Sequence, residues 1–142
     1  MRLFVYGVLI RELAKGRAAE LVASLKEGLP ATVRGAVYAV RGADGGYYPI
    51  LLEDPEGGEV QGVVHEAGTV EWQAMDEFED AGGGPDAEYE RREVAVMLPN
   101  GFVTQAQAYC YARDVPGDAI AIESGSFTRW LEDTGNRPIE AR

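Results

Sequence analysis

Two segments on either side of an Asn-Gly dipeptide constrain the fold of this chain more than any other feature. Tyr89 to Leu98 and Phe102 to Tyr111 carry the strand-forming residues valine, tyrosine and phenylalanine, and Pro99-Asn100-Gly101 separates them. An Asn-Gly turn between two such segments is a strong short-range signal for a β-hairpin, because the tightest hairpin turns need positive φ at both central residues. The sequence therefore predicts an antiparallel hairpin here.

The rest of the chain alternates between strand-like and helix-like segments. Four earlier segments predict strands, the last three joined by glycine-rich turns as antiparallel hairpins: Arg2 to Tyr6, Thr32 to Val40, Tyr47 to Leu52 and Glu59 to His65. Three segments predict helices: Ile10 to Glu27, Val70 to Glu79 and Ser126 to Glu132. Several sequential strands with few helices predict an α+β domain in which a small sheet curls into a barrel.

The size and charge of the chain limit its organisation and partners. Its 142 residues fit a single domain over residues 1–142, of which 135–142 are expected to form a loosely ordered tail. The formal net charge of -11 argues against nucleic acid or an anionic membrane as a partner, because both require a basic patch. An exposed strand edge could pair with a second copy of the chain, so both a monomer and a homodimer stay open.

The N-terminal sequence and the cysteine content indicate a compartment. The apolar run from Leu3 to Ile10 is too short to span a bilayer and lacks a small-residue cleavage site. Cys110 is the single cysteine, so no internal disulfide can form, which fits a reducing environment. The cytoplasm is therefore the expected location.

Cofactor and metal motifs are absent from the sequence. There is no G-x-G-x-x-G fingerprint, Walker loop or G-x-S-x-G elbow. A single histidine, His65, and the lack of a Cys-x-x-Cys pair make a zinc site improbable. We expect no metal and no cofactor.

Two short segments carry the candidate chemistry. The first strand stops at the sequence Tyr6-Gly7-Val8-Leu9, where a turning backbone can offer N–H groups to an anionic ligand. The second segment is the helix that ends at Glu79. At about 100° per residue from Val70, Glu79 lies near 180°, on the apolar side between Met75 and Trp72.

Other polar residues of this segment differ from Glu79 in their predicted orientation. Gln73, Asp76, Glu77 and Asp80 fall on the opposite arc of the wheel and are expected to face water. Half-burial of the Glu79 carboxyl would raise its pKa above the usual value of about 4.3, so that it could exchange protons near neutral pH. The alternative is a solvated acidic helix end, the ordinary role of a glutamate in such a cluster.

Further polar residues admit structural explanations. His65 and Cys110 both lie on predicted strands and could form a nucleophile and base pair, but both residue types are also common in cores. The tyrosines are explained first as strand formers, of which one or two could reach a pocket through their hydroxyls. The loop Gly82 to Gly84 is a flexible connection or a lid.

Five short motifs occur along the chain in a distinctive order. They are Tyr6-Gly7-Val8-Leu9, Tyr48-Pro49, Val60-Gln61-Gly62-Val63-Val64, Asp76-Glu77-Phe78-Glu79 and Tyr89-Glu90-Arg91-Arg92-Glu93-Val94-Ala95-Val96. In this order the chain resembles the gamma-glutamylcyclotransferase-like superfamily, and within it the gamma-glutamylamine cyclotransferase branch. The resemblance covers nearly the whole chain.

The resemblance implies an activity and a set of site residues. It implies an α+β fold with a small mixed or antiparallel β-barrel and flanking helices. It also implies an enzyme that forms 5-oxoproline from a small γ-glutamyl compound and expels an amine or amino acid, without a cofactor. Glu79 would be the catalytic acid and base. Tyr6, Gly7, Val8, Leu9 and Tyr89 would bind the substrate.

Val8 departs from the family pattern. The family usually has a hydroxyl residue here, and an isopropyl group cannot offer that hydrogen bond, although backbone donors could remain. Ile10-Arg11-Glu12 matches the usual continuation only approximately. Two alternatives therefore stay open: a non-catalytic ligand-binding or interaction module on the same fold, and a related enzyme for a different amide.

Overall fold

The computed structural model of the chain describes residues 2–6, 28–43, 45–66, 72, 76 and 88–139. Trp72 and Asp76 are helical, and the predicted helix over residues 10–27 lies outside the described part. The strands and the complete helix are β1 (Arg2–Val5), β2 (Leu29–Arg41), β3 (Tyr47–Glu53), β4 (Gly58–Glu66), β5 (Tyr89–Met97), β6 (Val103–Tyr111), β7 (Ile120–Ala121) and α3 (Phe127–Thr134).

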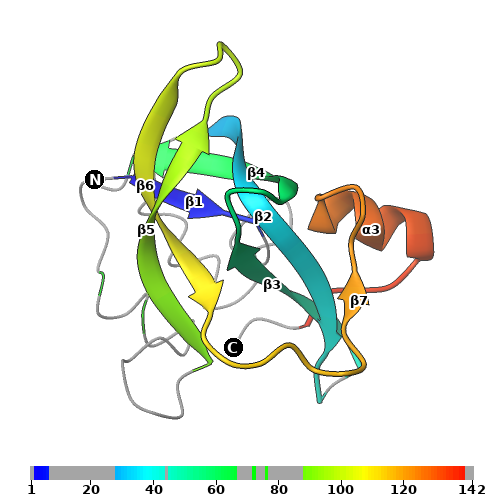
Figure 1. Ribbon diagram of the computed structural model, residues 1–142. Helices are drawn as coiled ribbons and strands as arrows, with labels where there is room; N and C mark the ends of the chain where they lie inside the picture. Colours follow the sequence, from blue (N-terminus) through cyan, green and yellow to red (C-terminus); the bar gives the residue numbers. More distant parts are fainter. Residues whose placement is uncertain are drawn as a thin grey trace.

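Five of these strands close into a barrel (Figure 1). They follow the order β2-β4-β1-β6-β5, and β5 returns to β2 where Thr32 pairs with Met97. Strand β1 is antiparallel to β4 and parallel to β6, so the barrel is mixed. The predicted α+β fold with a small mixed β-barrel is confirmed.

Strand β2 is the longest element of the barrel, at 13 residues, and it pairs with two others in succession. Its first half, up to Gly35, pairs with β4, and its second half pairs with β3. The expected β2–β3 hairpin is therefore present. The expected β3–β4 hairpin is not, because both strands use β2 as their antiparallel partner.

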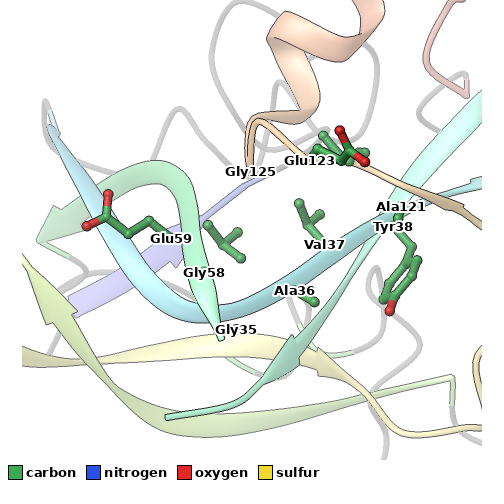
Figure 2. Close-up of a pocket in the computed structure, with 11 residues that line it drawn as sticks. Gly35, Ala36, Val37, Tyr38, Gly58, Glu59, Ala121, Glu123 and Gly125 are labelled. Atoms are coloured by element: carbon green, nitrogen blue, oxygen red, sulfur yellow. The ribbon is translucent and has the colours of Figure 1, made fainter. Parts of the chain in front are cut away.

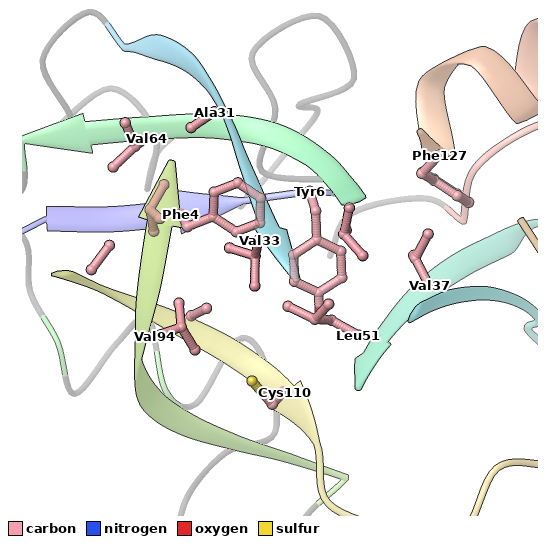
Figure 3. Packing of buried hydrophobic residues seen from close by; sticks show 14 of the residues in the cluster. Phe4, Tyr6, Ala31, Val33, Val37, Leu51, Val64, Val94, Cys110 and Phe127 are labelled. Atoms are coloured by element: carbon pink, nitrogen blue, oxygen red, sulfur yellow. The ribbon is translucent and has the colours of Figure 1, made fainter. Parts of the chain in front are cut away.

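The barrel interior is filled by alternate residues of each strand. Phe4 and Tyr6 project from β1 and the residue that follows it, and Figure 3 shows their rings at the centre of the buried cluster. Small residues opposite them leave the space that the rings need, since a Cβ atom on Gly62 would lie 2.7 Å from Phe4 Cζ. Large and small side chains thus pack in complementary positions.

Helix α3 covers one side of the molecule beside β7 (Figure 1). Ser126 caps its first turn by accepting a hydrogen bond from the Arg129 N–H at 3.2 Å, and Gly135 ends it with φ 72°. Phe127 and Leu131 are buried in the main cluster. The predicted C-terminal helix is confirmed, with a few residues added at its end.

Part of the C-terminal tail contacts β3. The Tyr47 N–H donates to the Arg137 carbonyl, and the Ile139 N–H donates to the Tyr47 carbonyl, both at 2.9 Å. These bonds attach the described residues of the tail to the first residue of β3.

Candidate active site

Tyr6 marks the end of β1 and the start of the predicted anion-binding loop. Its side chain is buried with 7% exposure, and its ring stacks with Phe4 at a centroid distance of 6.2 Å. Its hydroxyl donates to the backbone carbonyl of Tyr109 on β6. The side chain therefore anchors the loop's first residue to the barrel. Gly7, Val8 and Leu9 lie outside the described residues.

Asp76 is held against the β5–β6 ladder. The Tyr109 hydroxyl donates to Asp76 Oδ1 at 2.6 Å, and Arg91 Nε lies 3.0 Å from the same oxygen. The two side chains of the ion pair are only 28% and 23% exposed. The expectation that Asp76 faces water is therefore wrong, because β5 and β6 supply a cation and a hydroxyl donor for its carboxylate.

Arg91 also contacts the residue one helical turn before Asp76. Its guanidinium carbon lies 4.5 Å from the centre of the Trp72 ring, within the range of a cation–π interaction. Trp72 and Asp76 are four residues apart, so they share one helical face. That face is directed toward β5. Glu79 lies outside the described residues.

Tyr89 joins two more of the sequence motifs. It is 8% exposed, its hydroxyl donates to the Pro49 carbonyl at 2.8 Å, and its ring meets Tyr111 edge-to-face at 5.7 Å. The hydroxyl predicted to reach a ligand thus has a backbone partner on β3. Because the hydroxyl proton is used in that bond, Tyr89 can offer a ligand its ring or the acceptor lone pairs of its oxygen.

A second tyrosine on β3 has an acidic partner. The Tyr48 hydroxyl donates to Glu88 Oε2 at 2.7 Å. Burial raises the pKa of Tyr48, and the hydrogen bond and charge of Glu88 raise it further. Burial, followed by the charge of Glu88, likewise raises the pKa of Tyr111. Both phenols therefore stay neutral and remain hydrogen-bond donors near neutral pH.

Sequence reasoning did not single out Tyr109 or the role of Asp76. The position of the hairpin turn could have predicted where Tyr109 lies. In every β5–β6 pair the two residues are equally far from Asn100 in the sequence. Counting nine residues in both directions from Asn100 pairs Arg91 with Tyr109. Cross-strand partners lie on the same face of a sheet, so a cation and a phenol are placed together there.

A comparison with known families assigns the chain to one of them. Residues 3–129 match the model of the family described as "Gamma-glutamyl cyclotransferase, AIG2-like". The chain belongs to this family. The superfamily resemblance stated from the motifs is thereby confirmed, and an enzyme of the gamma-glutamyl cyclotransferase kind is supported in general.

Solved structures with the cyclotransferase fold superpose on most of the chain. An AIG2-like protein from Mus musculus gives a TM-score of 0.72 at 22% identity, with 99% of this chain and 97% of that chain covered. A gamma-glutamyl cyclotransferase gives 0.67 at 19% identity, covering 98% and 89%. The TM-scores show a shared fold, and at these identities the likeness extends to the fold alone.

YkqA from Bacillus subtilis differs in length. It gives a TM-score of 0.66 at 22% identity and covers 94% of this chain, while the chain covers 42% of YkqA. The present chain therefore spans less than half the length of YkqA. No curated protein matches the sequence significantly.

The possible His65–Cys110 pair is not supported by the barrel geometry. Cys110 points into the buried cluster, as does Val64 on β4. Successive side chains of a strand point to opposite faces, so His65 faces outward, where it lies against Gly28. Burial raises the pKa of the Cys110 thiol to about 11, which disfavours the nucleophilic thiolate.

A shallow cavity opens in another part of the cyclotransferase fold. It has a volume of about 210 Å³ and lies between β2, β4 and the segment that leads to α3 (Figure 2). The carboxylates of Glu59 and Glu123 lie at its opposite ends. None of the residues around Asp76 lines it.

The described residues offer neither a metal cluster nor a membrane span. No group of three or more histidine, cysteine or acidic side chains among them could hold a metal ion. In the same part of the chain, no helix has the length and apolar character needed to cross a bilayer.

Proposed function

We propose that this protein is a cytoplasmic gamma-glutamyl cyclotransferase that releases 5-oxoproline from a small γ-glutamyl amine or peptide. The observation that carries the proposal is the contact between Asp76 and Arg91. Asp76 begins the Asp-x-x-Glu motif, and Arg91 belongs to the Tyr-x-Arg motif. Two segments that the resemblance assigns to one site thus meet in space. Their contact is made by Asp76, which precedes Glu79 by three residues.

The proposed catalytic acid and base is Glu79. On the predicted helical wheel Glu79 lies about 20° from Trp72. The contact of Trp72 with Arg91 turns that side of the helix toward β5, which supports an orientation of Glu79 away from bulk water. A carboxyl in such surroundings is suited to exchange protons near neutral pH.

The reaction requires two proton movements. The carboxylate of Glu79 takes a proton from the α-ammonium group, and the neutral amine then attacks the γ-amide carbonyl carbon to form the ring C–N bond. The carboxyl delivers its proton to the departing nitrogen as the old C–N bond breaks. The ring nitrogen then gives up its second proton to Glu79, which passes it to the released amine, so the amine leaves as an ammonium ion.

The substrate would be bound by Tyr6, Gly7, Val8, Leu9 and Tyr89. Backbone N–H groups after Tyr6 would hold the glutamyl carboxylate or the developing oxyanion. Tyr6 and Tyr89 donate their hydroxyl protons to backbone carbonyls. We therefore propose that these two side chains form the wall of the substrate pocket and set its shape. We propose no metal or cofactor, no nucleic-acid or membrane partner, and a monomer or homodimer.

The test compares wild type with Glu79→Gln, using mass spectrometry to detect 5-oxoproline from a panel of γ-glutamyl amines and dipeptides. Loss of general acid–base catalysis is expected to lower turnover by about 10² to 10⁴-fold. Glu77→Gln is the matched control, because this carboxyl is only two residues away but lies about 160° from Glu79 on the helical wheel. Equal turnover of Glu79→Gln and wild type would refute the role of Glu79.

Val8 motivates a second candidate, a non-catalytic module that binds a small ligand on the same fold. This candidate predicts saturable binding of γ-glutamyl compounds by calorimetry, with no product from either protein. A related enzyme for a different amide predicts a released amine without 5-oxoproline. The product analysis thus separates all three functions.

A further inference from the structure

Tyr109 is covered on the outer face of the barrel. Its neighbours Ala108 and Cys110 point into the central cluster, so its own side chain points outward, toward Arg91, its partner on β5. The residue is nevertheless only 3% exposed. A residue on the outer face can be this buried only if further chain packs over it, and Asp76 belongs to that covering chain.

Two parts of Tyr109 bind two different segments. Its backbone carbonyl accepts the hydroxyl proton of Tyr6, the residue that opens the predicted loop. Its side-chain hydroxyl donates to Asp76 at 2.6 Å. A strand's carbonyls lie in the sheet while its side chains stand perpendicular to it, so the two contacts extend in different directions from one residue.

Arg91 makes a different kind of contact with Asp76. Its Nε lies 3.0 Å from Oδ1, but the N–H is not aligned for a hydrogen bond. The guanidinium therefore contributes charge without fixing the direction of the carboxylate. The short hydrogen bond from Tyr109 is the directional contact, because hydrogen bonds weaken steeply away from linear geometry.

We propose that Tyr109 is a positioning residue that holds the loop after Tyr6 and the segment bearing Asp76 at a fixed distance from each other. The inference rests on the proposed function, in which that loop binds the glutamyl group and Glu79, three residues after Asp76, moves the protons. Cyclisation needs the substrate and the carboxyl aligned, and a misplacement of about 1 Å can cost about 10²-fold in rate.

Removal of the Tyr109 hydroxyl has a specific kinetic consequence. Tyr109→Phe retains the backbone carbonyl and therefore the partner of Tyr6, so substrate binding by the loop is preserved. The carboxyl is no longer held in register with the bound substrate. We expect kcat per mole of folded protein to fall by about 10- to 100-fold while KM changes little. The folded fraction must be measured, because a loss of folded protein alone would lower the apparent kcat without changing KM.

Two comparisons separate positioning from stability. Tyr38→Phe removes a hydroxyl from β2 beside the cavity of Figure 2 and is expected to leave kcat unchanged. Asp76→Ala removes the acceptor, so Tyr109→Phe is expected to add nothing further in that background. A kcat for Tyr109→Phe equal to that of Tyr38→Phe would overturn the proposal, as would independent effects of Tyr109→Phe and Asp76→Ala.

Trp72 provides a measurement that does not depend on turnover. The chain has two tryptophans, so a Trp130→Phe background leaves Trp72 as the only indole. Because Trp72 lies one turn from Asp76, loss of the Tyr109 bond is expected to increase quenching of its fluorescence by acrylamide, whereas Tyr38→Phe leaves quenching unchanged.

The two measurements distinguish the proposals. Increased quenching in a protein that makes no 5-oxoproline would support the anchoring role of Tyr109 while the proposed function fails. Unchanged quenching would overturn the anchoring role whether or not the wild type is active. Increased quenching together with a selective fall in kcat is the result expected if both proposals hold.

Discussion

At the scale of single residues, Gly62 determines how closely β1 approaches β4. A Cβ atom at this position would lie 2.3 Å from the Val5 carbonyl oxygen and 2.7 Å from the Phe4 ring. Val5 immediately precedes Tyr6, so the packing of this glycine also sets where the proposed loop begins. Glycine within a strand is typical of such a close backbone approach.

Gly62→Ala is therefore expected to destabilise the barrel. Overpacking of this kind lowers the free energy of unfolding by about 1–3 kcal/mol, measured by urea denaturation. Gly58→Ala is the matched control on the same strand, because its Cβ would meet only the Gly35 carbonyl oxygen at 4.0 Å. That substitution should stay within about 0.5 kcal/mol of wild type. Equal stabilities of the two variants would contradict this account of Gly62.

At the scale of elements, the β5–β6 hairpin shows what local sequence can predict. The Asn-Gly turn predicts a hairpin, and the structure has it: Gly101 adopts φ 86° and the Leu98 N–H donates to the Phe102 carbonyl at 2.8 Å. The sequence also predicts the positions of strands β3 and β4 to within one residue at each end. It does not predict their common pairing with β2, because partner choice between distant strands is decided by the whole sheet and not by the intervening turn.

Helix α3 depends on one capping residue, which gives a prediction for the element. The Ser126 hydroxyl accepts the Arg129 N–H, so Ser126→Ala leaves an amide of the first turn without this acceptor. A loss of about 1 kcal/mol in the free energy of unfolding is expected from urea denaturation. Ser126→Thr preserves a capping hydroxyl and should recover most of the loss. If Ser126→Thr and Ser126→Ala were equally unstable, the cap would not be the cause.

At the scale of the whole molecule, the candidate site depends on closure of the barrel. Tyr6 and Tyr109 lie more than a hundred residues apart in the chain, yet their contact brings the end of β1 to β6. The resemblance predicts Glu79 and the loop after Tyr6 as site residues, and the wheel predicts a packed side for the helix. The wheel placed Asp76 in water because apolar positions alone defined its buried side, whereas Arg91 and Tyr109 made a polar contact possible there.

Cys110 reports on the integrity of the closed barrel. It is 2% exposed within the central cluster, and burial, followed by the charge of Glu53, raises the pKa of its thiol from 9.0 to about 11. The folded state therefore favours the neutral thiol more than the unfolded state does. The contribution of the neutral Cys110 thiol to the free energy of unfolding is fully present below about pH 9 and is lost as pH rises toward 11.

The alkaline stability of the protein should accordingly depend on this thiol. Over two pH units the loss amounts to at most about 2–3 kcal/mol, because each pKa unit corresponds to about 1.4 kcal/mol. Urea denaturation at pH 8, 9 and 10 measures it, with Cys110→Ala as the comparison. The burial that raises the pKa of Tyr48 acts in both proteins and cancels from the difference between them. Wild type should lose stability more steeply than Cys110→Ala, and parallel pH profiles would show that the thiol does not ionise on unfolding in this range.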